Sequence, residues 1–337
     1  MGELRVRVQS ALTSFIDEQV HGLGDLAADL APITGALSRL AVGGKGLRPA
    51  FCYWACVGLG GSDSDALVRA AASLELLQAC ALVHDDLMDR SDIRRGQPAA
   101  HLEFAAQHAR RGWEGDPAVF GTGTAVLLGD LALAWCDQML TGCGLPAESL
   151  ARARPAFNRM RTEMVAGQYL DLLEAAKGGC SVAGALRVVA YKTVRYTVEG
   201  PLQLGAALAG SPAGDALSAY GIPLGEAFQL RDDLLGVFGD PNVTGKPAGD
   251  DLREGKRSVL LALASARGAD LTGIGGKDPD LPRLRRVLIA SGAVAQAEEM
   301  IGERTAAAVR ALRAVPLTAR AAHALQALAV AATDRAA

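Results

Sequence analysis

Three aspartates at the end of an apolar segment have the spacing needed to bind a divalent cation. Asp85 and Asp89 are four residues apart, so on a helix they share a face, and Asp86 lies beside them. Carboxylates this close repel one another unless cations neutralise them. Carboxylate oxygens suit a hard cation such as Mg²⁺, which keeps coordination positions open for phosphate oxygens. The alternative is an ordinary solvated acidic helix end.

Basic residues follow this acidic cluster, and the arrangement recurs later in the chain. Arg94 and Arg95 come just after it and are suited to bind phosphates by charge-assisted hydrogen bonds. A second pair, Asp232 and Asp233, ends another apolar segment, and a Gly-rich polar loop with two lysines spans 239–256. If the two acidic helix ends face each other across a cavity, they could hold one diphosphate between several Mg²⁺ ions.

With these motifs, the chain resembles the trans-isoprenyl diphosphate synthases of the polyprenyl synthetase family, and most of all its geranylgeranyl diphosphate synthases. The resemblance rests on five blocks that occur in family order and span most of the chain: 43–49, 84–101, Gly167-Gln168 with Asp171, Lys192-Thr193, and 225–256. It implies an all-α fold of the isoprenoid synthase type I, a single large helical bundle around a central cavity. It also implies that residues 1–337 form one polyprenyl synthetase domain.

The resemblance implies a role for each matching residue. Asp85, Asp86, Asp89 and Asp232 match metal ligands, and Asp233, Arg94, Lys192 and Lys246 join them as catalytic residues. The isopentenyl diphosphate side matches Lys45, Arg48 and Arg95. The allylic side matches Arg94, Gln168, Asp171, Lys192, Thr193, Gln229, Lys246 and Lys256. Gln78 stands where the family often has His, and either side chain can hydrogen-bond a diphosphate oxygen.

The implied reaction is a head-to-tail prenyl transfer between isopentenyl diphosphate and an allylic diphosphate of five to fifteen carbons. The allylic diphosphate loses pyrophosphate, the double bond of isopentenyl diphosphate attacks the cation, and a proton is lost. Mg²⁺, with three ions expected per substrate-bound site, and nearby Lys and Arg side chains stabilise the departing pyrophosphate. The pyrophosphate can accept the proton, so no protein base is required.

The second motif departs from the family pattern at one position. It usually reads DDxxD, whereas Gly236 stands here in the third acidic position. Asp240 is four residues further on, but Gly239 and the loop that follows make it an uncertain substitute. The departure puts the number of ligands on that side in doubt and leaves the reaction class unchanged.

Product length depends on residues one to three turns before Asp85, which are expected to line the tunnel for the growing chain. Ala81 and Cys80 are small, and no aromatic residue stands near them as it does in farnesyl-producing and some geranylgeranyl-producing relatives. We therefore expect a tunnel deeper than C15, with Leu77 as its floor and Leu74 as the next candidate. The predicted product is geranylgeranyl diphosphate (C20), with a C15 or a C25 or longer product as the alternatives.

Two other protein classes share parts of this pattern. A class I terpene cyclase also carries an Asp-rich motif, but it needs no second diphosphate site such as the Lys45 and Arg48 turn. A non-catalytic regulatory subunit would be expected to lose Asp or Lys residues, and only Gly236 departs here. Both alternatives are therefore less favoured than an active synthase.

Composition limits the remaining possibilities. Half of the 337 residues are hydrophobic, the formal net charge is −3, and the pI is near 6.0, which argues against a nucleic-acid partner. The charged N-terminal segment has no apolar core of a secretory signal, and no apolar run reaches the length of a spanning helix. The six cysteines form no CxxC pair, so buried free thiols in a reducing cytoplasm are expected. A homodimer is expected from the resemblance alone.

Helical periodicity predicts the elements that position these residues, and no segment predicts a sheet. A flexible turn at 41–46 and a helix from Pro49 to about residue 58 carry the Lys45 and Arg48 pair. The 110–117 segment is predicted as a surface loop. Other helices are expected over 4–40 with a break near 22–24, and over 65–89, 118–140, 150–174, 182–209, 216–237, 258–266, 281–291, 293–314 and 317–333.

Overall fold

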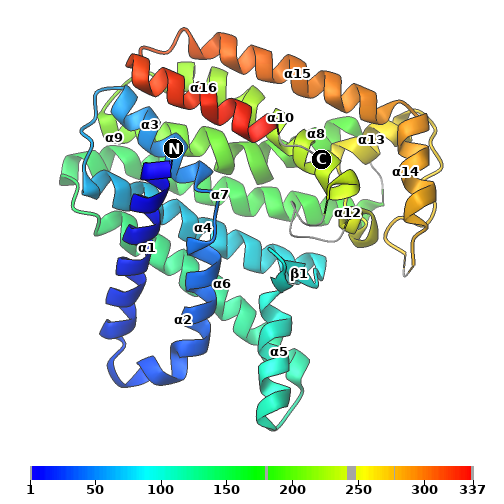
Figure 1. Cartoon of the computed structure of the whole chain (residues 1–337), viewed down its shortest axis with the longest axis horizontal. Coiled ribbons are helices and arrows are strands. Elements are labelled where there is room, and N and C mark those ends of the chain that lie inside the picture. The colour runs from blue at the N-terminus through cyan, green and yellow to red at the C-terminus, as the bar shows by residue number, and fades with distance from the viewer. Residues whose placement is uncertain (1, 179–180, 241–247, 277, 335–337) are drawn as a thin grey trace. The chain divides into compact units, whose positions relative to one another are not determined.

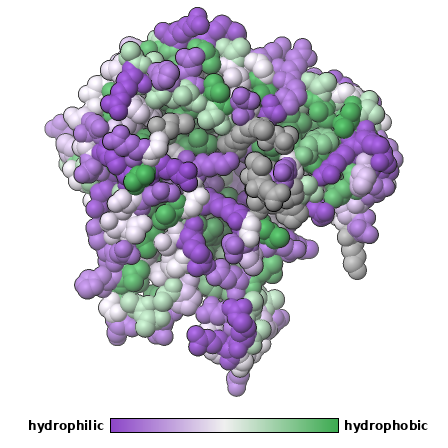
Figure 2. Space-filling view, in the orientation of Figure 1, coloured by the Kyte–Doolittle hydropathy of each residue, from purple (hydrophilic) through white to green (hydrophobic). Residues whose placement is uncertain are grey.

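A computed structural model describes residues 2–178, 181–240, 248–276 and 278–334, and the chain is almost entirely helical (Figure 1). The only strands among these residues are β1 (Ile93–Arg94) and β2 (Gln97–Pro98), which form a small antiparallel ribbon. The all-α fold class predicted from the composition and periodicity is therefore confirmed. Polar residues cover most of the face in Figure 2, interrupted by small apolar patches.

The chain divides into two compact units. The first comprises Met1–Arg154 and Leu204–Ser211, and the second Pro155–Gln203 and Pro212–Ala337. The first unit contains α1 (Gly2–Gly22), η1 (Gly24–Leu26), α2 (Ala27–Val42), α3 (Leu47–Gly58), α4 (Asp65–Asp89), α5 (Ala100–Arg111) and α6 (Pro117–Thr141). The single domain expected from the family resemblance remains a prediction.

The second unit begins within α7 and continues to the C-terminal helices. Its elements are most of α7 (Ala147–Lys177), α8 (Val182–Val189), η2 (Ala190–Glu199), the start of α9 (Gly200–Ala209), α10 (Gly214–Phe238), α12 (Asp250–Glu254), α13 (Val259–Ala266), α14 (Leu281–Ala290), α15 (Ala293–Leu312) and α16 (Ala319–Thr333). Within this unit α10 packs against η2, α15 and α16. The Tyr220 hydroxyl of α10 donates a hydrogen bond to the Leu325 carbonyl of α16 at 2.7 Å.

Helix α4 is the central helix of the first unit and carries the first acidic motif. It packs against α1, α2, α3 and α6, and its side chains are buried around most of its circumference. Ser64 begins the helix, because its hydroxyl accepts the Leu67 N–H. A helix that is apolar on nearly all sides has to be surrounded by other elements. This packing holds the C-terminal end of α4, which carries the acidic motif, in place.

By length and composition, two helices, α4 and α6, are long and apolar enough to cross a membrane. By this criterion of length and composition, the expectation that no apolar run is as long as a spanning helix is wrong. In α4, 72% of the most apolar window is buried inside the protein, as expected of a core helix. In α6 the buried share is 39%, because one apolar face of this helix is exposed.

The structure also differs from the predicted elements at three places. The segment predicted as one helix over 182–209 is helical throughout, but its middle part, η2, has wider π-helical turns. Helix α5 was not predicted, because only Ala100, Phe104 and His108 of its residues are buried and its apolar pattern is sparse. The helix extends through Arg111, so the predicted loop over 110–117 is shorter than expected. The short helix α12 was likewise not predicted.

Candidate active site

The first acidic motif occupies the last turns of α4. The helix ends at Asp89, and Arg90 follows in the left-handed conformation with φ of 57°. Asp86 is buried, with 3% of its surface exposed, whereas Asp85 and Asp89 are half-buried. Asp85 and Asp89 share a face, as their spacing predicted. They are also more exposed than Asp86.

A tight turn directs the two arginines that follow the motif to different partners. Arg94 lies opposite Gln97 in the β1–β2 ribbon, and the turn residues Arg95 and Gly96 both have positive φ, as in a type I′ turn. Arg95 donates from Nη1 to the Leu40 carbonyl of α2 at 2.7 Å. Arg94 reaches back to the acidic motif instead. The hairpin therefore separates the two arginines that the resemblance assigns to different diphosphates.

Arg94 forms a shielded ion pair with Asp86. Its Nε donates to Asp86 Oδ1 at 2.8 Å and to Oδ2 at 3.1 Å, and its Nη2 also donates to Asp86 Oδ1. The same Nη2 lies 3.7 Å from Asp85 Oδ2. Because the side chains of Arg94 and Asp86 are only 15% and 4% exposed, water weakens the pair little. The structure thus brings together the acidic motif and the first of the predicted arginines.

The Gly43-Gly44 turn packs against Glu75, a buried residue of α4 that the sequence analysis missed. Glu75 is 3% exposed, and a Cβ atom added at Gly44 would lie 2.0 Å from its Oε2. Burial raises the pKa of the Glu75 carboxyl, while the charges of Arg48 and Arg95 oppose the rise. A single Glu among apolar residues of α4 is the signal that could have identified it. Glu75 therefore lies next to both arginines predicted for the isopentenyl side.

Replacing Gly44 by Ala is expected to lower the free energy of unfolding by about 1–3 kcal/mol, the usual cost of overpacking. The added methyl group overlaps the carboxylate of Glu75, so this buried side chain has to shift within the packed core. Gly35→Ala is the matched control: its Cβ would lie 3.8 Å from the nearest atom, and Ala favours a helix interior. Urea denaturation of both variants measures the difference. Equal stability of the two would contradict this account of the turn.

Gln78, Leu77 and Ala81 follow one another along α4 before the acidic motif. The side-chain amide oxygen of Gln78 is buried and has no hydrogen-bond partner among the described residues. Leu77 is fully buried and Ala81 is half-buried. Ala81 and Leu77 are four residues apart and share the face of Asp85.

Cys80 and His84 pack on another side of α4, toward α6. Cys80 Sγ lies 3.8 Å from His84 Nδ1, and His84 Nε2 lies 3.2 Å from the Val126 carbonyl. Gly129 makes room for the imidazole, because a Cβ atom there would lie 2.1 Å from Nε2. Cys80 is buried and free, as are the four other described cysteines; Cys180 lies outside the described residues. These contacts support a structural role for His84.

In the second unit, Lys192 of η2 forms an ion pair with Asp171 of α7. The Lys192 Nζ donates to Asp171 Oδ2 at 2.5 Å, and both side chains are about four-fifths buried, with 23% and 20% exposed. Gly167 allows the close approach, because a Cβ atom there would lie 2.2 Å from the Lys192 backbone nitrogen. Gln168, also predicted for the allylic site, is half-buried next to Gly167. Two motifs that are distant in the sequence therefore meet at this point.

A chain of hydrogen bonds links η2, α10 and the start of α13. Thr193 Oγ1 donates to Gln229 Oε1 at 2.7 Å, and Gln229 Nε2 donates to Asp233 Oδ1 at 2.8 Å. The Val259 N–H donates to Asp233 Oδ2 at 3.0 Å, in the first turn of α13. Both oxygens of Asp233 are thus used within the protein. Asp233 holds the start of α13, and the half-buried Asp232 is the accessible member of the pair.

Burial raises the pKa of Asp233 to about 7. The hydrogen bonds from Gln229 and Val259 lower it, and the negative charges of Asp251 and Asp232 raise it further. Asp251 is therefore close enough to Asp233 to act on its charge, although the sequence analysis did not single it out.

The remaining predicted residues of the second motif lie in or near the loop after α10. Lys256 Nζ lies 2.9 Å from Glu254 Oε2 and 3.8 Å from Asp251 Oδ1. Asp240 is exposed, just past the end of α10. Lys246 lies outside the described residues, so its predicted role remains untested. On the other unit, Lys45 is exposed and Arg48 is half-buried at the start of α3.

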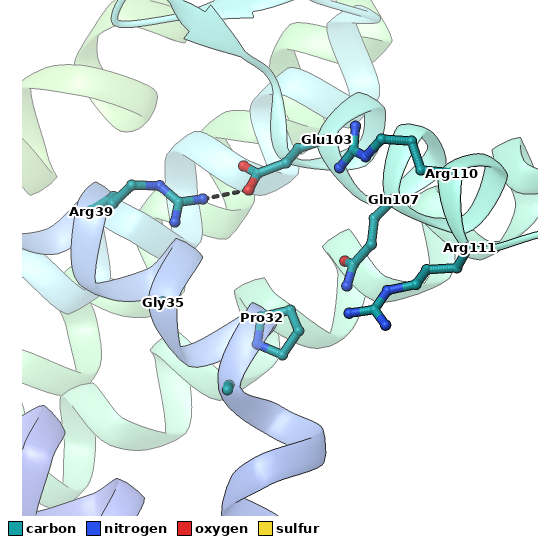
Figure 3. A pocket seen from close by; sticks show the side chains of 8 residues that line it. Pro32, Gly35, Arg39, Glu103, Gln107, Arg110 and Arg111 are labelled. Carbon is teal, nitrogen blue, oxygen red and sulfur yellow. Dashed lines mark hydrogen bonds and ion pairs between the residues drawn. The ribbon is translucent and has the colours of Figure 1, made fainter.

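An open pocket of about 330 Å³ lies between α2 and α5 of the first unit (Figure 3). Arg39 and Glu103 form an ion pair across it at 2.5 Å, and Arg110 and Arg111 line its other side. None of the predicted site residues lines this pocket. We therefore assign a candidate site to the acidic helix end of each unit, and neither of them to this pocket.

The carboxylates of the two helix ends are the only donors predicted for a cation. Among the residues that the structure describes, no three His, Cys, Asp or Glu side chains converge on one point. One or two carboxylate oxygens per ion suit Mg²⁺, because water and substrate phosphates fill its remaining coordination positions. They do not fit a structural Zn²⁺ site, which requires four converging nitrogen or sulfur ligands.

Comparisons with known proteins show which family the chain is similar to. A sequence model described as polyprenyl synthetase matches residues 32–273. The chain is 34% identical over 278 residues to a geranylfarnesyl diphosphate synthase from Aeropyrum pernix, covering 79% of this chain and 82% of that protein. It is also 34% identical over 227 residues to a (2E,6E)-farnesyl diphosphate synthase from Mycobacterium tuberculosis, covering 67% of this chain and 58% of that protein.

A solved structure gives a more extensive match. The geranylgeranyl pyrophosphate synthase from Corynebacterium glutamicum, complexed with isoprenyl diphosphate and magnesium, is 41% identical to this chain. The match covers 99% of both chains with a TM-score of 0.95.

Proposed function

The chain belongs to the polyprenyl synthetase family of prenyltransferases, and from this premise we propose that it elongates allylic diphosphates with isopentenyl diphosphate to a C20 product, geranylgeranyl diphosphate. The reaction joins the two substrates head to tail and releases pyrophosphate. The alternatives are a C15 or a C25 or longer product. The observation that carries the proposal is a largely buried ion pair between predicted site residues in each unit: Arg94 with Asp86, and Lys192 with Asp171.

The difficult step is the separation of charge when the allylic carbon–oxygen bond breaks. Bound divalent cations, Mg²⁺ by the chemistry of the donor set and up to three per site, supply positive charge to the leaving pyrophosphate. Asp85, Asp89 and Asp232 would hold these ions, and Asp86 and Asp233 would keep Arg94 and α13 in place. Arg94, Lys192 and Lys256 bind phosphate oxygens, and Lys246 is proposed to join them.

Lys45, Arg48 and Arg95 are proposed to bind isopentenyl diphosphate, with Gln78 as a further hydrogen-bond donor. Glu75, next to Arg48 and Arg95, supports this grouping. Thr193 and Gln229 orient each other, which leaves the Gln229 side chain held in one position near the accessible Asp232. Gln168 and Asp171 complete the allylic side. The released pyrophosphate accepts the proton, so the residues named here bind, orient and stabilise charge.

The proposed C20 product follows from the face of α4 that precedes Asp85. Ala81 is small and half-buried, and Leu77 is fully buried one turn further along the helix. Cys80 contacts His84 on another side and is less suited to line the chain. A growing chain can therefore pass Ala81 and would be stopped at Leu77.

Replacing Ala81 by Phe is expected to shift the product from C20 to C15, because the ring blocks the space beside Asp85 one turn before Leu77. The number of isopentenyl diphosphate units added to each allylic primer falls, while the first condensation continues. Mass spectrometry of the dephosphorylated products measures the shift. Ala28→Phe, on an exposed part of α2, is the control for an added aromatic ring. An unchanged product from Ala81→Phe would exclude this face as the tunnel wall.

We further propose a homodimer in the cytoplasm. An apolar face of α6 is exposed, with Val119, Val126 and Leu127 at 69%, 42% and 62% of their surface, and such a face suits a second copy of the chain. The five described free cysteines fit a reducing compartment. Light scattering of the purified protein gives the mass, and a monomer at micromolar concentration would contradict the dimer.

A product assay tests the proposed function. Purified protein is incubated with Mg²⁺, isopentenyl diphosphate and, separately, C5, C10 and C15 allylic diphosphates, and the products are sized by mass. A C20 product supports the proposal, and longer products would move the floor beyond Leu77. Absence of elongation with every primer, from folded protein, would favour the non-catalytic subunit.

A further inference from the structure

The pocket between α2 and α5 has small residues on the α2 side. Both helices contact α4 and α6, and the space between them has a volume of about 330 Å³. Ala31, Gly35 and Arg39 lie four residues apart from one another along α2, so they share a face. Beyond its own helix backbone, a Cβ atom added at Gly35 would meet only Arg39 Nη1 within 4 Å among the described residues, at 3.8 Å. This face of α2 therefore leaves room for a small molecule.

The face of α5 that borders the pocket is polar. Glu103, Gln107, Arg110 and Arg111 have the spacing i, i+4, i+7 and i+8, which places all four on one side of the helix. Figure 3 shows the side chains of Gln107 and Arg111 extending from α5 toward α2. Hydrogen-bond donors thus surround an open space that has small residues on its other side.

The pocket carries more positive than negative charge. Three arginines line it, Arg39, Arg110 and Arg111, with Glu103 as their single carboxylate. Glu103 pairs with Arg39, and both side chains are exposed, at 40% and 58%, so this ion pair contributes little to stability and is easily exchanged. Among the described residues, neither Arg110 nor Arg111 has an ion pair or hydrogen bond through its side chain. Two guanidinium groups are therefore available to an anion.

The ordinary explanation of two arginines in the last turn of a helix is that they stabilise its negative end. That role needs neither a cavity nor a further arginine on another helix. Here Arg39 of α2 borders the same space as Arg110 and Arg111 of α5. Guanidinium groups bind phosphate oxygens by paired, charge-assisted hydrogen bonds, so this grouping suits a phosphate better than a helix end alone requires.

We propose that this pocket is an additional anion site, which binds a small polyvalent phosphate, such as inorganic pyrophosphate, through Arg39, Arg110 and Arg111. Gln107 adds a neutral hydrogen-bond donor, and Arg39 exchanges Glu103 for the bound anion. The site lies apart from the predicted catalytic residues, none of which lines the pocket. The inference goes beyond the proposed function, because it concerns binding and involves no turnover.

Isothermal titration calorimetry of the whole chain with inorganic pyrophosphate tests the site. EDTA is present throughout, so that no divalent cation carries pyrophosphate to the acidic motifs. A dissociation constant of roughly 0.1–1 mM is expected from a few charge-assisted hydrogen bonds at an open site. Sodium chloride of equal ionic strength measures unspecific screening. Co-sedimentation with phosphatidylglycerol vesicles tests whether a lipid headgroup supplies the phosphate instead.

Tryptophan fluorescence gives a second readout close to the pocket. Trp113 lies two positions after Arg111 and is 46% exposed, whereas Trp54 and Trp135 are buried at 7% and 6%. A change in emission on adding pyrophosphate is therefore expected to come mainly from Trp113. The change is expected to saturate at the concentrations that saturate the calorimetric signal.

Three variants are expected to change the affinity in different directions. Arg110→Gln combined with Arg111→Gln is expected to weaken binding at least tenfold, because charge-assisted hydrogen bonds are lost. Gly35→Leu fills the pocket without changing its charge and is expected to cause a similar loss. Glu103→Gln removes the competing carboxylate and is expected to strengthen binding roughly threefold.

The matched control is Arg154→Gln combined with Arg159→Gln. Both are exposed arginines of α7 that do not line the pocket, so the control removes the same charge elsewhere. It is expected to bind pyrophosphate as tightly as the wild type. Circular dichroism establishes that each variant is folded, and the surface arginine variants keep the test decisive if Gly35→Leu does not fold.

Several results would overturn the inference. A wild type that binds no pyrophosphate in EDTA is one, and a response equal to that of sodium chloride is another. A third is an Arg110 and Arg111 double variant that binds as tightly as the α7 control. Weaker binding by Glu103→Gln would exclude the exchange at Arg39. Binding to vesicles without binding to pyrophosphate would replace the small free anion by a lipid headgroup.

Discussion

Replacing Asp85 by Asn is expected to lower the rate of chain elongation roughly 10²- to 10³-fold, the usual effect of removing one group that stabilises charge in the transition state. Asp85 is an accessible carboxylate of the first motif, and it lies 3.7 Å from Arg94 Nη2. Its amide analogue keeps the shape of the side chain but loses the charge that holds a cation. The variant is expected to fold, because the neighbouring pair of Asp86 and Arg94 remains intact.

The measurement is single-turnover elongation at saturating Mg²⁺ with a radiolabelled allylic primer. Asp92→Asn is the control, because Asp92 is an exposed aspartate just past the same helix. It is expected to keep the wild-type rate. If both variants elongate equally fast, Asp85 is not part of the catalytic machinery.

Replacing Lys192 by Ala is expected to produce the second large loss, roughly 10²-fold in kcat/KM for the allylic substrate. The ammonium group is about three-quarters buried and paired with Asp171, so its removal also leaves that carboxylate without its partner. The loss is expected to be larger for the allylic diphosphate than for isopentenyl diphosphate, because the predicted contacts of the latter lie on the first unit.

Lys177→Ala is the matched control for Lys192. It lies on the same helix as Asp171, its side chain is 57% exposed, and it pairs with Glu174 at 2.9 Å on the surface. Surface pairs of this kind contribute little, so wild-type kinetics are expected. Steady-state kinetics with each substrate varied in turn separate the two sides. An equal loss for both substrates would argue against an allylic role for Lys192.

The sequence was informative where the signal is local. Helical periodicity predicted most helices, including the long apolar segment that ends at Asp89, and the spacing of Asp85 and Asp89 predicted their shared face. The break after Gly22 and the αL residue at Gly46 likewise agree with the local pattern of glycines. Local signals of this kind depend on residues within one or two turns of each other.

The sequence was uninformative where a residue acts through a partner that is distant in the chain. Glu75 and Gly44 are separated by one complete helix, and Asp251 and Gly236 lie fifteen positions apart in the sequence, so no periodic pattern connects either pair. Asp233 differs from Asp232 because it accepts a hydrogen bond from the Val259 N–H, and Val259 likewise lies beyond the motif. Short elements such as α12 and the β1–β2 ribbon have too few buried residues to produce a pattern.

The ion pair of Arg94 with Asp86 also has a consequence for ligand selection. A diphosphate that binds Arg94 through Nε or Nη2 has to replace the Asp86 carboxylate, which already accepts hydrogen bonds from both nitrogens, so association at these nitrogens is an exchange of partners. The net gain in binding free energy is the difference between the contact of Arg94 with the diphosphate and its contact with Asp86. This gain grows with the charge of the incoming anion. Inorganic phosphate or a prenyl monophosphate, with fewer oxygens and less charge, is expected to compete poorly for Arg94. The Asp86 carboxylate is thereby expected to favour diphosphate esters over monophosphates at Arg94.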